Sequence, residues 1–444
     1  MEEDTQLSLE FPGIRNKSIS ADFAGGAVTS DGGVLFLRQM ERGLGAIGRF
    51  VSCLVDNRHQ GYVYHSHVDM LRRRVYQIAL GYEDCNDSDT LRDDPGLKTA
   101  CERLPFSDES LASQPTLSRL ENIVSRSMLY RMGVAQVETF IASYRGAPSR
   151  IILDIDDTCD PTHGAQQLSL FNGYYDTYCY QPLHIYEGKS GKLILSLLRP
   201  GKRPTGAQVV SILKRVVSRI HRAWPHTKIL LRGDGHFSTP EVLDFCDEKG
   251  LEYVLGLQVR KPLAEVIDMD LLQRSFEVLQ EKIRFFTECR YQGSRWKRWR
   301  RVIVKAEVSE QGHNLRAIVT NIRGGKAKRL YDRLYCARGQ MENFIKNHKT
   351  VLHSDRTSCH RFEANQFRLF LHSAAYVLLH ALQEHGLKGT PYQKAQFDTI
   401  QVRLLKIGAR VIEKATRIKF HFPTSFPLKH VFAAMQENLA FAFP

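Results

Sequence analysis

The order of apolar segments between residues 150 and 257 places the narrowest limit on the fold. Short apolar runs typical of strands are IILDIDD, YCYQPLHIYE, KLILSLLRP, KILLRGDG and EYVLGL. Two runs with helical spacing separate the later ones, PTGAQVVSILKRVVSRIHRAW and STPEVLDFCDEKG. The letters GKSG between the second and third runs are a hairpin signal. The order strand, strand, strand, helix, strand, helix, strand predicts an α/β fold in which helices cover a mixed sheet.

Acidic residues stand at the ends of two of these predicted strands. Asp234 follows the apolar run KILLRG, and DIDDTCD closes the first strand with several acids. In α/β folds, functional sites usually lie at strand ends. By the alternation of a strand, Asp154 shares a face with Asp156 but lies two residues deeper, whereas Asp157 points to the opposite face. Alternation alone therefore does not decide whether Asp154 or Asp156 is the functional acid at the end of the first strand.

A third acid occurs in the segment YDRLYCARGQMENFIKNHK. There Tyr335, Arg338, Glu342 and Lys349 are three, four and seven residues apart. At about 100° per residue on an α-helix, these steps return close to one meridian, so the four side chains form one stripe. Taken alone, such a stripe is more often a solvated helix face with i,i+4 ion pairing than a functional site.

The rest of the chain divides by pattern into further regions. Residues 1–149 contain short helical patterns that indicate either a helix-turn-helix or a plain helical bundle. Residues 258–329 contain three candidate strands among charged segments, which predicts a β-rich insertion. Residues 330–444 are predicted to be largely helical, including a helical pattern over 399–414.

Charge and composition favour a nucleic-acid partner. The chain has 62 Lys and Arg residues against 48 Asp and Glu residues, a formal charge of +14, with cations clustered over 290–301 and 326–349. The run GSRWKRWRR places Trp296 and Trp299 beside Arg298 and other cations. That composition suits base stacking beside a phosphate track, although either Trp could instead be buried in the insertion.

Compartment signals predict a cytoplasmic protein. The start MEEDTQLSLE is unlike a signal peptide, and no apolar run approaches the length of a membrane span. The nine cysteines are scattered without CxxC pairs, as expected of reduced thiols.

These motifs together resemble a known family. The spacing Y-(2)-R-(3)-E-(6)-K, with LDIDDTCDPTHG, LLRGDGHFSTPE and YCARGQMENFIKNHK, resembles the bacterial cut-and-paste insertion-sequence transposases. It looks most like the insertion-sequence family numbered thirteen-eighty, over nearly the whole chain. The resemblance implies an RNase H-like core (150–257 and 330–444) interrupted by the β-rich insertion, with a helical DNA-binding region at 1–149.

The resemblance also implies a catalytic site. The triad would be Asp156, Asp234 and Glu342, binding two Mg²⁺ ions that Mn²⁺ can replace. Asp156 is preferred over Asp154 because it forms the Asp-x-Thr pattern with Thr158.

DNA contacts follow from the same resemblance. Arg338 and Lys349 would hold phosphates, Tyr335 would contact the backbone, and Lys346 could add a phosphate contact. One insertion tryptophan, Trp296 or Trp299, would stack on a flipped base.

The expected function is cleavage at insertion-sequence ends and strand transfer into target DNA. The expected partner is double-stranded DNA, namely terminal inverted repeats and target, bound by a homodimer on paired ends in the bacterial nucleoid. Two alternatives are an RNase H-like nuclease without strand transfer and a non-catalytic DNA-binding protein derived from a transposase.

Overall fold

The computed structural model describes residues 8–442, and the chain forms two compact units. The terminal unit comprises Met1–Val51, Asp56–Leu120 and Leu378–Pro444, and the sheet unit comprises Ser52–Val55 and Glu121–Val377. By their contacts, residues 121–149 group with the sheet unit, and residues 378–442 group with the N-terminal segments.

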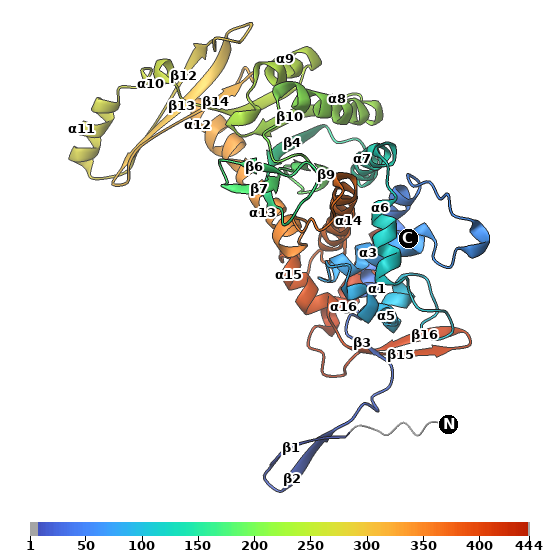
Figure 1. Cartoon of the computed structure of the whole chain (residues 1–444). Coiled ribbons are helices and arrows are strands. Elements are labelled where there is room, and N and C mark those ends of the chain that lie inside the picture. Colours follow the sequence, from blue (N-terminus) through green and yellow to red (C-terminus); the bar gives the residue numbers. More distant parts are fainter. Residues whose placement is uncertain (1–7, 443–444) are drawn as a thin grey trace. The chain divides into compact units, whose positions relative to one another are not determined.

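An eight-stranded mixed sheet forms the centre of the sheet unit (Figure 1). Its order is β12-β13-β14-β11-β10-β4-β8-β9, in which β10 is parallel to β4 and β11 and every other neighbouring pair is antiparallel. The strands are β4 (Arg150–Asp157), β8 (Leu183–Glu187), β9 (Leu193–Leu197), β10 (Lys228–Gly233), β11 (Glu252–Leu257), β12 (Ile283–Tyr291), β13 (Arg300–Ser309) and β14 (Gly312–Thr320). The predicted mixed α/β sheet is therefore confirmed.

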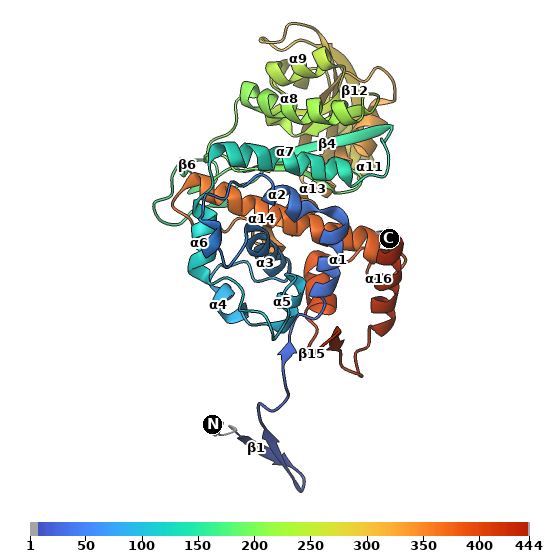
Figure 2. The ribbon, with the colours of Figure 1, turned by 90° about the vertical axis from the view of Figure 1, so that its right-hand side faces the viewer.

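Helices cover both faces of this sheet. Ile151, Leu153 and Ile155 of β4 join the core beneath α7 (Arg126–Ala142), α8 (Gly206–Ala223) and α9 (Pro240–Lys249). Figure 2 shows these three helices side by side. Ile152 belongs to the core on the other side, together with Leu330 of the following helical run. The two cores follow from the period of two in the strand, which sends successive side chains to opposite faces.

Local sequence fixes the ends of the covering helices. Thr205 and Gln208 form a capping box at the start of α8, and Thr239 caps α9 just before Pro240. Gly250 ends α9 with a positive φ of 66°. The capped start of α9 and the end of β10 define the loop between them, which carries Asp234.

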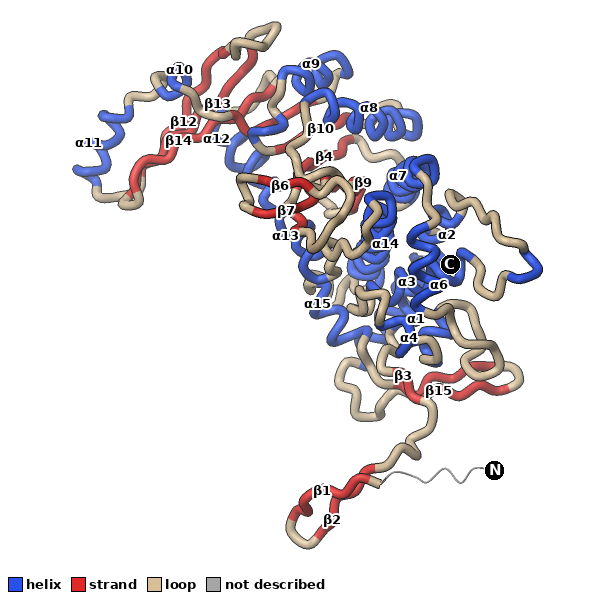
Figure 3. Tube along the Cα trace, viewed as in Figure 1, coloured by secondary structure: helices blue, strands red, loops and turns tan. Residues whose placement is uncertain are grey.

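The insertion extends the central sheet. Residues 258–329 contain α10 (Lys261–Ala264), α11 (Met269–Leu279) and strands β12, β13 and β14, which Figure 3 shows as long strands. Leu255 of β11 pairs with Val319 of β14, so the three insertion strands continue the core sheet from its β11 edge.

A small second sheet lies beyond the end of β4. It has the order β5-β7-β6 and consists of β5 (Asp160–Pro161), β6 (Leu170–Asn172) and β7 (Thr177–Tyr180). The run YCYQPLHIYE, predicted as one strand, is in fact split between β7 and β8 at Gln181 and Pro182. Proline lacks the N–H that a continuous ladder requires, which accounts for the break.

The terminal unit is mostly helical but begins with a hairpin. Its elements are β1 (Leu9–Ile14), β2 (Lys17–Ala21), β3 (Val28–Thr29), α1 (Val34–Leu44), α2 (Ala46–Val51), α3 (His67–Ala79), α4 (Asp87–Leu91), α5 (Pro95–Ala100), most of α6 (Gln114–Asn122), α15 (Phe397–Ile400), β15 (Ala409–Lys414), β16 (Arg417–His421) and α16 (Lys429–Ala442). The helix predicted over 399–414 is wrong in its second half. Residues 409–414 form β15 instead, because this segment pairs with both β16 and β3. Within residues 8–442, no helix has the length and apolar character needed to span a bilayer.

Candidate active site

Two of the predicted acids lie side by side at the ends of neighbouring strands. Ile155 of β4 pairs in parallel register with Gly233, the last residue of β10, and Asp156 and Asp234 are the next residues in the chain. Both acids line one cleft of about 780 Å³, together with Asp157 and His236. The cleft therefore gathers three carboxylates and an imidazole at the carboxyl ends of two parallel strands.

His236 connects two of these carboxylates. Its Nδ1 lies 2.6 Å from Oδ1 of Asp234, and its Nε2 lies 2.9 Å from Oδ2 of Asp157. Burial alone would lower the pKa of His236, but its hydrogen bonds to Asp157 and Asp234 outweigh burial and raise the pKa to about 9. The imidazole is therefore protonated at neutral pH, and both ring nitrogens donate. Burial raises the pKa of Asp234, but the hydrogen bonds and charge of His236, together with the charge of Arg338, outweigh burial, so that this pKa is lowered.

Asp156 has a different partner. Burial raises its pKa to about 7, the Arg338 guanidinium opposes that rise, and the negative charge of Asp234 adds to it. Arg338 Nη2 donates to Asp156 Oδ2 at 2.6 Å. The cation on the helical run thus compensates a carboxylate that is both desolvated and close to other acids.

Asp154, the alternative first acid, is a structural residue. Its two oxygens accept from Nε and Nη2 of Arg232, both at 2.6 Å, and the side chains are 0% and 2% exposed. Nη1 of Arg232 donates to the carbonyl of Leu334. A Cβ on Gly188 would collide with both members of the pair. Both oxygens of Asp154 are therefore used in the buried pair with Arg232, which favours Asp156 as the acid of the cleft.

Asp157 corrects the argument from alternation. We expected it to point away from Asp156, yet it lines the same cleft. Asp157 is the last residue of β4, and His236 reaches it over the end of the strand. Alternation separates side chains along a sheet, but not where loops fold over a strand end.

Glu342 lies on a helical run whose geometry changes along its length. The run consists of α12 (Ala327–Arg329), a π-helical turn at Leu330–Tyr335, a 3₁₀ turn at Cys336–Gly339, α13 (Gln340–Lys346) and a second π-helical turn at Asn347–Val351. The expectation of a single stripe assumed a uniform α-helix, and these changes of turn invalidate it. Glu342 is exposed. Within residues 8–442, no group of three His, Cys, Asp or Glu side chains, with or without Glu342, has an arrangement that could hold a metal ion.

The other residues of the spaced motif face the segments that carry the acids. Lys349 Nζ donates to Thr158 Oγ1 at 3.3 Å and to the carbonyl of Cys159, both in the chain just after Asp156. Tyr335 is half-buried, and a Cβ added to Gly256 would lie 2.8 Å from its hydroxyl oxygen. Arg338 and Lys349, predicted to hold phosphates, therefore have partners within the protein. Lys346 is exposed and open to a ligand.

The two insertion tryptophans have opposite environments. Trp296 is 8% exposed and packs edge-on against Tyr291, with ring centroids 5.6 Å apart. Its burial argues against the predicted contact with DNA. Trp299 is 57% exposed.

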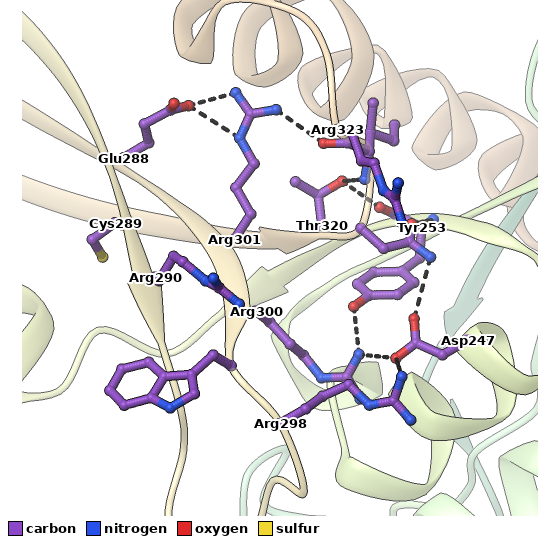
Figure 4. Close-up of a pocket in the computed structure, with 13 residues that line it drawn as sticks. Asp247, Tyr253, Glu288, Cys289, Arg290, Arg298, Arg300, Arg301, Thr320 and Arg323 are labelled. Carbon is purple, nitrogen blue, oxygen red and sulfur yellow. Dashed lines mark hydrogen bonds and ion pairs between the residues drawn. The ribbon is translucent and has the colours of Figure 1, made fainter.

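Trp299 lines a second cavity, of about 660 Å³, on the insertion (Figure 4). Two arginines of this cavity already form ion pairs within the protein: Arg300 with Asp247, and Arg301 with Glu288. The guanidinium of Arg298 is exposed, 3.8 Å from Asp247. Arg298 and Trp299 thus remain accessible as predicted DNA contacts.

Comparison with known families places the chain. The family model "Transposase DDE domain group 1" matches residues 11–442. The chain belongs to this family. Among solved structures, a cryo-EM structure of a piggyBac transposase synaptic complex with hairpin DNA matches with a TM-score of 0.44 and 10% identity, covering 94% of this chain and 86% of that one. No curated protein matches the sequence.

A DDE transposase is expected to use divalent metal, and the cleft contains side chains that could bind such an ion. Asp156 and Asp234 offer carboxylate oxygens, the ligands that Mg²⁺ prefers over nitrogen and sulfur. The charge of Asp234 helps to raise the pKa of Asp156, a repulsion that a cation between them would relieve. These two residues fit a divalent cation. The transposase signature was readable in the sequence, but the bridge through His236 was not, because it depends on Asp157 lying across the strand end.

Proposed function

We propose that this transposase cuts DNA at the ends of an insertion sequence and transfers those ends into target DNA. The observation that carries the proposal is the pair Asp156 and Asp234 at the ends of parallel neighbours β4 and β10. The order β9-β8-β4-β10-β11, with three antiparallel strands followed by two parallel ones, supports an RNase H-like core.

In the proposed site, Asp156 and Asp234 hold divalent metal, and Glu342 is the third acid. When bound, Mg²⁺ or Mn²⁺ activates an attacking oxygen and stabilises the leaving oxygen of a phosphodiester. His236 orients the Asp234 carboxylate through its 2.6 Å contact and keeps it ionised. Glu342 is exposed and lies one helical turn beyond Arg338, so its approach requires a local change in the helical run.

Arg338 has two roles in this proposal. It compensates the charge of Asp156 in the free protein, and its planar guanidinium can fork two phosphate oxygens when DNA is present. Lys349 acts similarly as a point charge beside Thr158. Tyr335, which is half-buried, contacts the DNA backbone in this proposal, and Lys346 adds an exposed cation for a phosphate.

The reaction proposed is hydrolysis followed by transesterification. Water cleaves one strand at the element end, and the freed 3′ hydroxyl then attacks another phosphodiester, with a hairpin intermediate on the element end. The basic insertion, with Arg298 and Trp299, and residues 1–149 hold the double-stranded terminal repeats. Two paired ends imply a homodimer on DNA. The resemblance of the three sequence motifs supports a place in the bacterial insertion-sequence family numbered thirteen-eighty, and DNA as the substrate implies a location at the bacterial nucleoid.

The proposal is tested by cleavage of DNA that spans both flanks of the coding sequence. Purified protein with Mn²⁺ or Mg²⁺ should nick at the element ends and join them to a plasmid target. Asp156→Asn, Asp234→Asn and Glu342→Gln should each abolish both steps. Glu310→Gln, which removes an exposed carboxylate at a turn of the insertion, is the matched control and should retain them.

Three outcomes would count against the proposal in different ways. Nicking without joining would leave a nuclease. Binding without any metal-dependent cleavage would leave a DNA-binding protein derived from a transposase. Cleavage that survives Glu342→Gln would remove that residue from the triad.

A further inference from the structure

The hairpin formed by β6 and β7 exposes an unusual set of aromatic rings. Phe171 is 54% exposed, Tyr174 is 83% exposed and Tyr178 is 61% exposed. Phe171 and Tyr178 contact each other edge to face across the hairpin, with ring centroids 5.5 Å apart. Contiguous exposed apolar groups of this kind usually mark an interaction surface.

The backbone beneath these rings is firmly held. The hydroxyl of Tyr180, in β7, donates to the carbonyl of Gln167 at 2.6 Å. Asn172 Nδ2 donates to the carbonyl of Gly201 at 3.1 Å, and a Cβ on Gly201 would collide with the backbone of the hairpin. The exposed rings therefore project from a fixed support, which keeps the entropic cost of binding low.

The hairpin forms a wall of the catalytic cleft. Phe171, Tyr174 and Tyr175 line the same cavity as Asp156 and Asp234. Burial raises the pKa of the Tyr175 phenol, and the charge of Asp157 raises it further, which is consistent with a position next to the acids.

Two cations complete this part of the cleft. Lys202 and Arg203 line it, are exposed, and form no ion pair with any residue in the described part of the chain. Aromatic faces beside unpaired cations are the combination by which proteins bind single-stranded nucleic acid, because each base offers a face for stacking and each phosphate a charge.

We propose that Phe171 and Tyr174 stack on unpaired bases of the DNA next to the cleavage site, while Lys202 and Arg203 hold the phosphates of the same strand. The ligand is single-stranded or unpaired DNA, since bases within an intact duplex are already stacked on their neighbours. This inference rests on the proposed function, which supplies DNA as the substrate of the cleft. In this proposal, the β6–β7 hairpin holds the separated strand at the cut. This role is distinct from the one predicted for the insertion tryptophans.

Fluorescence anisotropy tests the proposal without cleavage. A labelled blunt duplex and the same duplex with a short single-stranded tail are titrated with protein in EDTA. Loss of one base–aromatic stack should weaken binding of the tailed duplex by about 5- to 140-fold, from about 1–3 kcal/mol per stack. Phe171→Ala and Tyr174→Ala should show this loss on the tailed duplex and leave the blunt duplex unchanged.

Two controls separate stacking from general damage. Tyr174→Phe keeps the ring and should bind like wild type. Tyr130→Ala removes a comparably exposed ring from α7 and should also bind like wild type. Thermal melting of each variant shows whether it is folded. If an alanine variant does not fold, the test still rests on Tyr174→Phe, which must bind the tailed duplex more tightly than the blunt duplex.

Equal affinity of wild type for both duplexes, or equal losses on both, would overturn the inference. So would loss of self-association in sedimentation with tail binding intact, because the rings would then contact a second copy of the chain. Failure of the proposed function is read separately, as absence of metal-dependent cleavage by wild type.

Discussion

Replacing Asp154 by asparagine should unfold the sheet unit at a clearly lower temperature without removing a catalytic group. In the native chain, the Asp154 carboxylate accepts two hydrogen bonds from Arg232, and both side chains are almost completely buried. The amide of the Asp154→Asn variant would keep one acceptor oxygen but would leave the guanidinium charge of Arg232 buried without a counter-charge.

The size of the loss follows from that unpaired charge. Removing one partner of a buried ion pair costs about 3–5 kcal/mol of unfolding free energy. Burial raises the pKa of Asp154 even though Arg232 lowers it, so desolvation already offsets part of the attraction. We therefore expect the lower end, about 3 kcal/mol, which corresponds to a fall in Tm of roughly 6–12 °C for a unit of this size.

Asp156→Asn should behave in the opposite way. Asp156 is desolvated and repelled by Asp234 and Asp157, so the amide removes an unfavourable charge while keeping an acceptor for Arg338. The expected variant melts at or above the wild-type temperature in EDTA and has lost cleavage.

Circular dichroism melts in EDTA, together with the Mn²⁺-dependent cleavage assay, separate the two residues. A double variant, Asp154→Leu with Arg232→Met, should recover much of the stability lost in Asp154→Asn, because an apolar pair leaves no buried charge. Two results would refute the reasoning. One is an Asp154→Asn protein that melts like wild type, and the other is an Asp156→Asn protein that still cleaves.

Two further predictions concern other buried groups. Burial lowers the pKa of His184 to about 3, helped by the charge of Lys349, so below pH 6.5 the unfolded chain binds a proton that the folded chain refuses. The contribution of His184 to the unfolding free energy should therefore fall by up to about 1.4 kcal/mol per pH unit as pH drops from 6.5 towards 3, and His184→Gln should reduce the slope measured in urea titrations by that amount. On the insertion, Arg300→Met should cost about 3–5 kcal/mol because it leaves Asp244 and Asp247 without their buried cation, whereas Arg298→Met, at an exposed site, should shift the melt by no more than about 0.5 kcal/mol.

Strand positions could be predicted from sequence because the period of two is a property of the pleated backbone. The letters IILDIDD alone predicted a strand with Asp154 and Asp156 on one face, and this segment forms β4. The roles of Asp154 and Asp156 could not be separated in this way. That separation depends on Asp154 lying opposite Arg232 of β10, a register that only the folded sheet fixes.

The helical run illustrates a different limit. Sequence spacing indicated that Arg338, Glu342 and Lys349 belong together, and the structure does turn Arg338 and Lys349 towards the end of β4. The angle between successive side chains, however, depends on whether the backbone forms α, 3₁₀ or π turns. Side-chain periodicity does not reveal that choice, so the position of Glu342 could not be predicted from its spacing.

The cations of the motif that contains Tyr335, Arg338, Glu342 and Lys349 balance the charge of the acids, although the four side chains do not form the single stripe that was predicted. Acids gathered at the ends of β4 and β10 repel one another, and the structure supplies cations to them from separate segments: His236 to Asp234, Arg338 to Asp156, and Lys349 within 3.5 Å of Asp160. In the proposed mechanism, Arg338 and Lys349 must exchange these carboxylates for phosphates when DNA enters the cleft. An exchanged Arg338 leaves Asp156 free for metal, so DNA binding and metal binding should strengthen each other by the same factor, as any two linked equilibria must.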